Sequence, residues 1–105
     1  MPTIAQLENL LAKEPDDVFL NFGLAMALAK EMRFDEACAR FDRALSFDAG
    51  YIPAWFQKGR TLSDAGRFPE ARQALASGIA KAKETGDFHA VAEMEELLTR
   101  LHEGG

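Results

Sequence analysis

The residues best suited to chemistry in this sequence are two histidines and a single cysteine. His89 and Glu93 are four residues apart, a spacing that would place them on one face of a helix as a pair of metal ligands. No third ligand stands beside them, so we interpret them as an exposed ion pair or as two side chains without any interaction. Cys38 is far in sequence from His89 and His102, and no motif sets a nucleophile beside an oriented base. We therefore predict a protein that is not an enzyme, with no catalytic residues, no metal site and no cofactor.

Composition and charge narrow the class of partner. Hydrophobic residues make up 48% and charged residues 28% of the 105 residues, which is typical of a folded chain. The net charge of -5 gives no positive field for phosphates, so we expect no nucleic-acid partner. The longest uncharged run, residues 18–29, is shorter than the roughly 20 residues of a membrane helix. The N-terminus has no basic, apolar signal sequence, so we expect no membrane and a cytoplasmic location.

The elements that would position these residues are helices. Apolar residues recur at spacings of three and four along the chain, and this pattern predicts an all-α fold of about six helices. Thr3 and Gln6 have the spacing of a capping box, which marks the start of the first helix. We expect the first four helices to occupy about 3–15, 17–31, 35–48 and 51–66, the fifth to begin near Pro69, and the last to run from about 87 to 103.

The chain also repeats itself with a period of 34 residues. Arg33, Phe34, Glu36 and Ala37 are matched by identical residues 34 positions later, and apolar size is conserved at other matched positions. Such a repeat predicts helix pairs that stack side by side. We divide a single domain, residues 1–105, into an N-terminal helix resembling half a repeat (1–16), repeat one (17–50), repeat two (51–84) and a C-terminal capping helix (85–105).

The period and the small-residue positions resemble those of the tetratricopeptide repeat (TPR) family. That family's pattern, W-x2-L-G-x2-Y followed by A-x3-F, corresponds here to Trp55, Lys58, Gly59, Leu62, Ala71 and Leu75, and one period earlier to Asn21, Leu24, Ala25, Leu28, Ala37 and Phe41. The resemblance implies a short right-handed α-solenoid of antiparallel helix pairs. It also implies a non-catalytic protein–protein interaction module, an adaptor or scaffold that binds a peptide segment in a concave groove.

The last expected helix departs furthest from the pattern, as a cap would. Its apolar stripe is predicted to consist of Phe88, Val91, Met94, Leu98 and Leu101, with Glu93, Glu96, Arg100 and Glu103 largely on the other side. We expect Ala82, in the helix before it, to be less tightly packed than Ala37 and Ala71.

The candidate binding residues come from the second and fourth helices. The second helix is apolar nearly all round, because Phe19, Phe22 and Met26 lie opposite its core stripe. Phe56 has the position of Phe22 one repeat later, so we expect the two rings to be neighbours. Positions that hold a ligand's terminal carboxylate in some relatives carry Phe22, Met26, Gln57 and Arg60 here, which favours apolar ligand side chains. The predicted groove residues are Phe19, Phe22, Met26, Lys30, Phe56, Gln57 and Arg60.

Two other interpretations of this apolar face remain open. The first helix or the C-terminal tail could cover Phe19 and Met26, in which case those residues are core. Alternatively, the face could bind a second copy of the chain and form a structural homodimer. In each binding interpretation the partner is another protein or peptide, and the sequence does not identify it.

Overall fold

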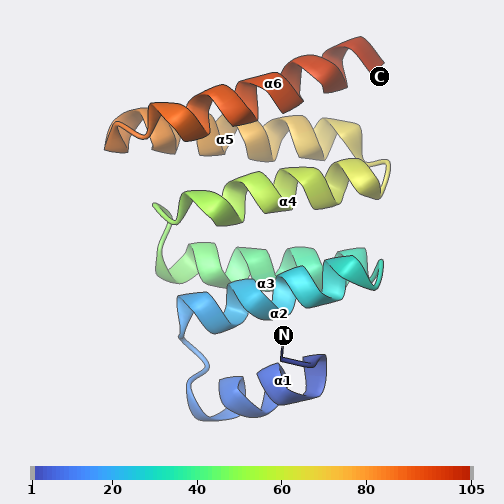
Figure 1. Ribbon diagram of the computed structural model, residues 1–105, viewed down its shortest axis with the longest axis vertical. Helices are drawn as coiled ribbons and strands as arrows, with labels where there is room; N and C mark the ends of the chain where they lie inside the picture. The colour runs from blue at the N-terminus through green and yellow to red at the C-terminus, as the bar shows by residue number, and fades with distance from the viewer. Residues whose placement is uncertain (1, 105) are drawn as a thin grey trace.

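The computed structural model describes residues 2–104, which form six α-helices joined by short turns (Figure 1). The predicted all-α fold and the number of helices are confirmed, as is the capping box of Thr3 and Gln6. The helices are α1 (Ile4–Lys13), α2 (Val18–Lys30), α3 (Phe34–Phe47), α4 (Ile52–Asp64), α5 (Phe68–Thr85) and α6 (Phe88–Gly104).

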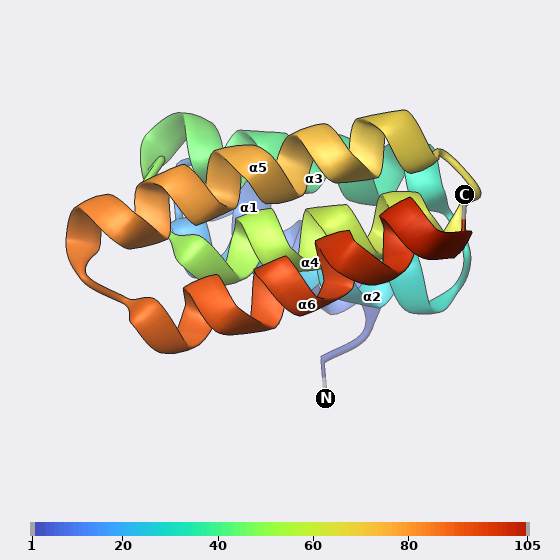
Figure 2. The ribbon, with the colours of Figure 1, turned by 90° about the horizontal axis from the view of Figure 1, so that it is seen from above.

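The helices stack in chain order and form two rows. Seen along the stack, α3 and α5 lie on one side and α2, α4 and α6 on the other, with α1 largely behind them (Figure 2). Within the described residues α4 contacts both α2 and α6, whereas α3 contacts neither α1 nor α5. Because successive helices touch in the row of α2, α4 and α6 and not in the other row, the stack curves toward the side of α2, α4 and α6. We call this side the inner face.

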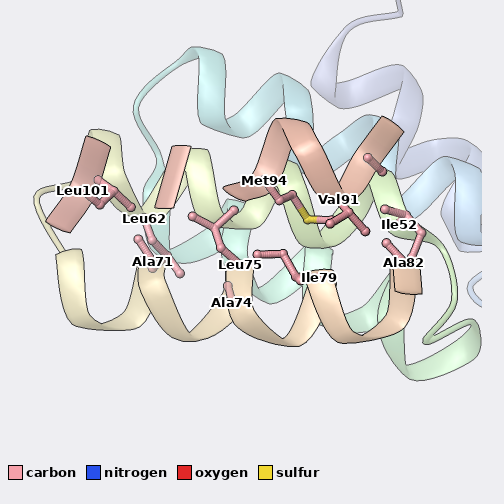
Figure 3. Close-up of a cluster of buried hydrophobic side chains, with 11 residues drawn as sticks. Ile52, Leu62, Ala71, Ala74, Leu75, Ile79, Ala82, Val91, Met94 and Leu101 are labelled. Atoms are coloured by element: carbon pink, nitrogen blue, oxygen red, sulfur yellow. The ribbon is translucent and has the colours of Figure 1, made fainter. Parts of the chain in front are cut away.

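The buried apolar side chains form two clusters along the stack. The lower cluster is formed mainly by α1, α2 and α3, with Phe41 at its centre, and the upper cluster by α4, α5 and α6, with Leu75 at its centre (Figure 3). Phe41 and Leu75 are 34 positions apart, so the matched position is a fully buried, large apolar residue in both clusters. Trp55 packs against both clusters and joins them.

Small residues allow the helices of the upper cluster to approach closely. A Cβ atom on Gly59 would lie 2.7 Å from side-chain carbons of Leu75. A Cβ atom on Gly78 would lie 2.6 Å from Trp55 Cβ and 2.8 Å from Met94 Sδ. Ordinary contacts between nonbonded heavy atoms are about 3.5–4.0 Å, so these two positions require glycine.

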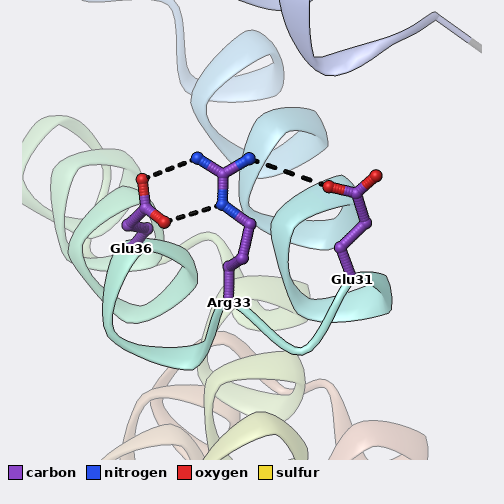
Figure 4. A network of polar contacts seen from close by, with 3 residues as sticks. All are labelled: Glu31, Arg33 and Glu36. Atoms are coloured by element: carbon purple, nitrogen blue, oxygen red, sulfur yellow. Dashed lines mark hydrogen bonds and ion pairs between the residues drawn. The ribbon is translucent and has the colours of Figure 1, made fainter.

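The turns after α2 and α4 repeat the same backbone geometry 34 residues apart. Met32 has φ 62° and Gly66 has φ 76°, both in the left-handed region, and each is followed by an arginine. Arg33 donates two hydrogen bonds to Glu36, at 2.7 and 2.8 Å, and also lies 3.7 Å from Glu31 (Figure 4). These hydrogen bonds lower the pKa of Glu36, which is a surface group.

The arginine of the second turn also connects the two halves of the stack. Arg67 pairs with Glu70, as Arg33 does with Glu36, and it additionally reaches Asp35 at the start of α3. Lys58 of α4 and Asp42 of α3 form a second ion pair across the same boundary, at 2.7 Å. The two halves of the stack are therefore linked by two ion pairs as well as by the packing of Trp55.

Asn21 and Trp55 occupy matched positions and make the same hydrogen bond despite their different side chains. Asn21 Nδ2 donates to the carbonyl oxygen of Pro15 at 3.1 Å, and Trp55 Nε1 donates to that of Ala49 at 2.9 Å. Each bond closes the loop that enters the helix. Asn21 is fully buried and also accepts a hydrogen bond from Arg40, which satisfies its amide oxygen. Asn21 departs from the aromatic residue of the pattern but still supplies the hydrogen-bond donor that Trp55 supplies one repeat later.

Two packing predictions around α6 are wrong. Phe88 is 68% exposed rather than part of the apolar stripe, and Ala82 is fully buried rather than loosely packed. The cause is a short turn: α5 continues to Thr85, Gly86 ends it at φ 77°, and the side chain of Asp87 then caps α6 by accepting from Ala90 N. Phe88 is consequently the first helical residue and precedes the buried stripe, which begins at Ala90 and covers the end of α5.

Candidate functional site

A series of aromatic rings runs from the lower cluster to the surface of α2. The ring of buried Phe41 lies 5.9 Å from that of Phe22, Phe22 lies 5.3 Å from Tyr51, and Tyr51 lies 5.4 Å from Phe19. The two contacts of Tyr51 are nearly perpendicular, the edge-to-face geometry that aromatic pairs prefer. Phe19, at the end of the series, is 69% exposed. Neither α1 nor the described part of α6 covers it.

The predicted contact between Phe22 and Phe56 is wrong. Among the described residues Phe22 makes its ring contacts with Phe41 and Tyr51, and it packs against the lower cluster, whereas Phe56 packs against the upper one. Tyr51 directly precedes α4, and its ring takes the place beside Phe22 that we expected for Phe56. Phe22 is therefore mainly a packing residue.

The remaining candidates on α2 differ in exposure. Met26 is half-buried and packs against the lower cluster, so the interpretation of this residue as core fits its position. Lys30 is exposed in the last turn of α2, where the helix dipole stabilises a positive charge. Of the four candidates on α2, Phe19 offers the largest free apolar surface.

The candidates on α4 line two adjoining clefts between α4 and α6. The first has a volume of about 340 Å³ and is lined by Phe56, Arg60, Ser63, Asp64, Leu97 and Arg100. The second, also about 340 Å³, is lined by Ile52, Pro53, Phe56, Gln57, Arg60, Asp87, His89, Ala90 and Glu93. The structure thus brings together the predicted residues Phe56, Gln57 and Arg60. Each cleft has the size of a small binding pocket.

In the part of the chain that the structure describes, the two arginines that line these clefts lack the carboxylate partners that other arginines of the chain have. Arg60 and Arg100 have no ion pair within the described chain, whereas Arg33 and Arg67 each contact carboxylates. Both unpaired arginines line the first cleft. In the second cleft His89 Nε2 lies 3.3 Å from Glu93 Oε1, so of the two open interpretations the exposed pair fits the structure.

Two further titratable groups have perturbed pKa values but suggest no catalysis. Burial raises the pKa of the Cys38 thiol, which packs partly against the upper cluster, so the thiol is a poor nucleophile. Burial, with a smaller effect of Asp48, also raises the pKa of the Tyr51 phenol. No group of three or more His, Cys, Asp or Glu side chains within the described residues is arranged to hold a metal ion.

Sequence reasoning missed Tyr51, Leu97 and Arg100 as inner-face residues. The repeat shift matches Tyr51 to Asp17, which caps a helix, so the shift gave no aromatic signal there. Arg100 was placed on the polar side of α6, and that side borders the cleft in part. The start of α6 at Asp87 was predicted, but the packing of α6 against α4, which brings Arg100 to the cleft, leaves no signal in the sequence.

Comparison with known proteins identifies the family. A family model described as tetratricopeptide repeat matches residues 28–94. A TPR repeat-containing protein of Pseudomonas aeruginosa is 34% identical over 98 residues, which is 93% of each chain. The chain belongs to the tetratricopeptide repeat family. Members of this family generally serve as protein–protein interaction modules and are typically non-catalytic.

Solved structures agree with this assignment. The solution structure of a protein from Bordetella parapertussis has a TM-score of 0.86 and 36% identity, over 99% of this chain and 90% of that one. The TPR2B domain of yeast Sti1, solved in a complex with pHsp70, has a TM-score of 0.89 at 22% identity, over 97% and 82% of the two chains. None of the described helices combines the length and the apolar character needed to cross a membrane.

Proposed function

We propose that this chain is a peptide-binding adaptor that holds a segment of another protein on its inner face. The proposed contact residues are Phe19 on α2 and Phe56, Gln57 and Arg60 on α4, with Met26 and Lys30 at the edge and Phe22 supporting the rings. The observation that carries the proposal is the pair of adjoining clefts between α4 and α6, which present an aromatic ring beside unpaired arginines.

The curvature of the stack supports the same proposal. A concave row of helices presents side chains from several helices to one extended or helical segment, which is how helical-repeat proteins bind. The similarity to the TPR2B domain supports a peptide partner, because that domain was solved with pHsp70 bound. We also propose that residues 17–50 and 51–84 are the two full repeats, between a half-repeat at 1–16 and a cap at 85–105.

The experiment is a pull-down with variants chosen to spare the fold. Phe19→Ser removes a ring that is 69% exposed, and Arg60→Gln removes a surface charge from both clefts. The tagged wild-type protein should retain specific proteins that the double variant loses, with circular dichroism unchanged. Leu10→Ser, at an exposed apolar residue of α1, is the matched control. Equal retention of partners by the wild type, the double variant and Leu10→Ser would refute the proposal that the inner face is the binding site.

Self-association through the same face is the second candidate, and the exposure of Phe19 favours it. A ring this exposed on an apolar helix is a common device of homodimer interfaces. Light scattering over a wide concentration range separates the two functions. A dimer that Phe19→Ser converts to a monomer supports self-association, whereas a monomer at every concentration excludes it.

A further inference from the structure

The first cleft between α4 and α6 combines an apolar floor with a positive rim. Phe56 of α4 and Leu97 of α6 are both half-buried and pack against the upper cluster, so their outer surfaces form a fixed apolar floor. Arg60 and Arg100 rise from the same two helices and are exposed. The cleft therefore offers apolar contact and cationic donors within one volume of about 340 Å³.

Arg60 and Arg100 differ from Arg33 and Arg67 because, in residues 2–104, they form no ion pair with a carboxylate. Arg33 and Arg67 are held by Glu36, Glu70 and Asp35, so their donors are already used. Arg60 and Arg100 have no ion pair or side-chain hydrogen bond within the described residues. A guanidinium group has five donors in a planar fork that matches a carboxylate. Two such groups at one cleft are left available to a ligand.

The other polar residues of the cleft limit what fits there. Asp64 contributes one carboxylate to the lining and Ser63 one hydroxyl. Two guanidinium groups against one carboxylate leave a positive excess in the cleft, although the whole chain carries a net charge of -5. A ligand with one carboxylate would balance this local excess, and Phe56 and Leu97 would accept the apolar group beside it.

We propose that this cleft binds an internal acidic side chain, Asp or Glu, next to a large apolar side chain of the partner peptide. The proposal rests on the proposed peptide-binding function and specifies its ligand. The carboxylate bridges Arg60 and Arg100, and the apolar side chain lies on Phe56 and Leu97. The group recognised is a side chain within the peptide, so the terminal carboxylate of the peptide takes no part.

The test is a selection from two random dodecapeptide libraries, one ending in a free carboxylate and one fused at its C-terminus. The wild-type protein should enrich peptides that carry Asp or Glu adjacent to Leu, Phe, Ile or Met in both libraries. An enriched peptide is then synthesised in its acidic form and with Asn or Gln at the acidic position, and affinities are measured by fluorescence anisotropy. The amide form should bind about tenfold more weakly, as expected when one charged hydrogen bond is lost.

Variants of the protein locate the effect. Arg60→Gln and Arg100→Gln should each weaken binding of the acidic peptide about tenfold, and should weaken the amide form much less, because the two changes remove one interaction. Arg72→Gln, on α5 of the outer row, removes the same charge away from the cleft and should change neither affinity. Affinity of the acidic peptide for the wild-type protein should also fall as salt rises.

The outcomes separate this inference from the proposed function. No enrichment in either library refutes both. Enrichment without acidic residues, equal affinity of the acidic and amide peptides, or enrichment in the free-carboxylate library alone refutes the inference and leaves the proposed function standing. Loss of binding in Arg72→Gln equal to that in Arg60→Gln also refutes it, because net charge would then explain the effect.

Discussion

The packing of α5 between α4 and α6 gives the sharpest prediction, which is that Gly78→Ala destabilises the protein. The new Cβ atom would lie 2.6 Å from Trp55 Cβ, 3.2 Å from Trp55 Cγ and 2.8 Å from Met94 Sδ. Met94 can move its thioether, but Trp55 Cβ is bonded to the backbone and the indole is held by its hydrogen bond to Ala49. Relief of the overlap therefore requires α4 and α5 to separate.

The size of the effect follows from two opposing terms. Overpacking a core position costs about 1–3 kcal/mol, and replacing glycine by alanine inside a helix gains up to about 1 kcal/mol. Because Trp55 Cβ cannot move away, we take the cost in the upper part of its range, about 2–3 kcal/mol, so the net destabilisation should be about 1–2 kcal/mol. Gly23→Ala is the matched control, because its Cβ would lie 3.6 Å from Leu7 Cδ2, an ordinary contact. That variant should be stabilised by up to about 1 kcal/mol.

Urea denaturation followed by both Trp55 fluorescence and circular dichroism measures these changes. Trp55 is the single tryptophan but lies at the substituted contact, so the second signal is needed. A Gly78→Ala protein as stable as the wild type would refute the close packing of α5 against α4. A Gly23→Ala protein that loses as much stability as Gly78→Ala would refute the distinction between the two sites.

Three further predictions concern the turn, the buried amide and the phenol. Met32→Gly should raise the free energy of unfolding by about 0.5–1 kcal/mol, because Met32 has φ 62° and is 71% exposed, whereas Gly66→Ala should lower it by about 1 kcal/mol; urea melts of both variants decide this. Asn21→Ala should cost about 1–3 kcal/mol because the carbonyl of Pro15 and the guanidinium of Arg40 lose a partner, and an unchanged midpoint would contradict it. Tyr51, the single tyrosine, should ionise above the usual pKa in an ultraviolet titration, so its contribution to stability is complete below the unfolded phenol's pKa of about 10 and is lost as pH rises through the folded value; titration at the ordinary pKa would contradict the burial of the ring.

The fold could be predicted from the sequence because its determinants are local or periodic. The capping box of Thr3 and Gln6 needs only neighbouring residues, and the match of Ala37 with Ala71 needs only the 34-residue shift. Such signals remain visible whatever the rest of the chain does. The shift fails where the spacing between helices changes. Phe88 has the helical spacing of the apolar stripe but is the first residue of α6 after the turn at Gly86, where it is 68% exposed.

The candidate site was less accessible to sequence reasoning because it depends on contacts between helices. Phe56, Gln57 and Arg60 lie on one face of one helix, so their common location followed from helical phase. The neighbours of Phe22 did not, because Tyr51 comes from the loop before α4, where no periodicity applies. Likewise, Arg100 and Arg60 line the same cleft only because α6 packs on α4.

The inner face differs between the two repeats, and we therefore expect the specificity of the proposed binding to lie there rather than in the core. Several core positions keep their apolar character over 34 residues, such as Leu28 and Leu62 or Phe41 and Leu75, because each fills equivalent space between stacked helices. Inner-face positions have no such constraint. Met26 on α2 is matched by Arg60 on α4, and Lys30 is matched by Asp64, which reverses the sign of the charge, whereas Phe19 and Pro53 are both apolar. For the proposed peptide, we therefore expect an apolar contact at Met26 on α2 and the acidic side chain at Arg60 and Arg100, on α4 and α6.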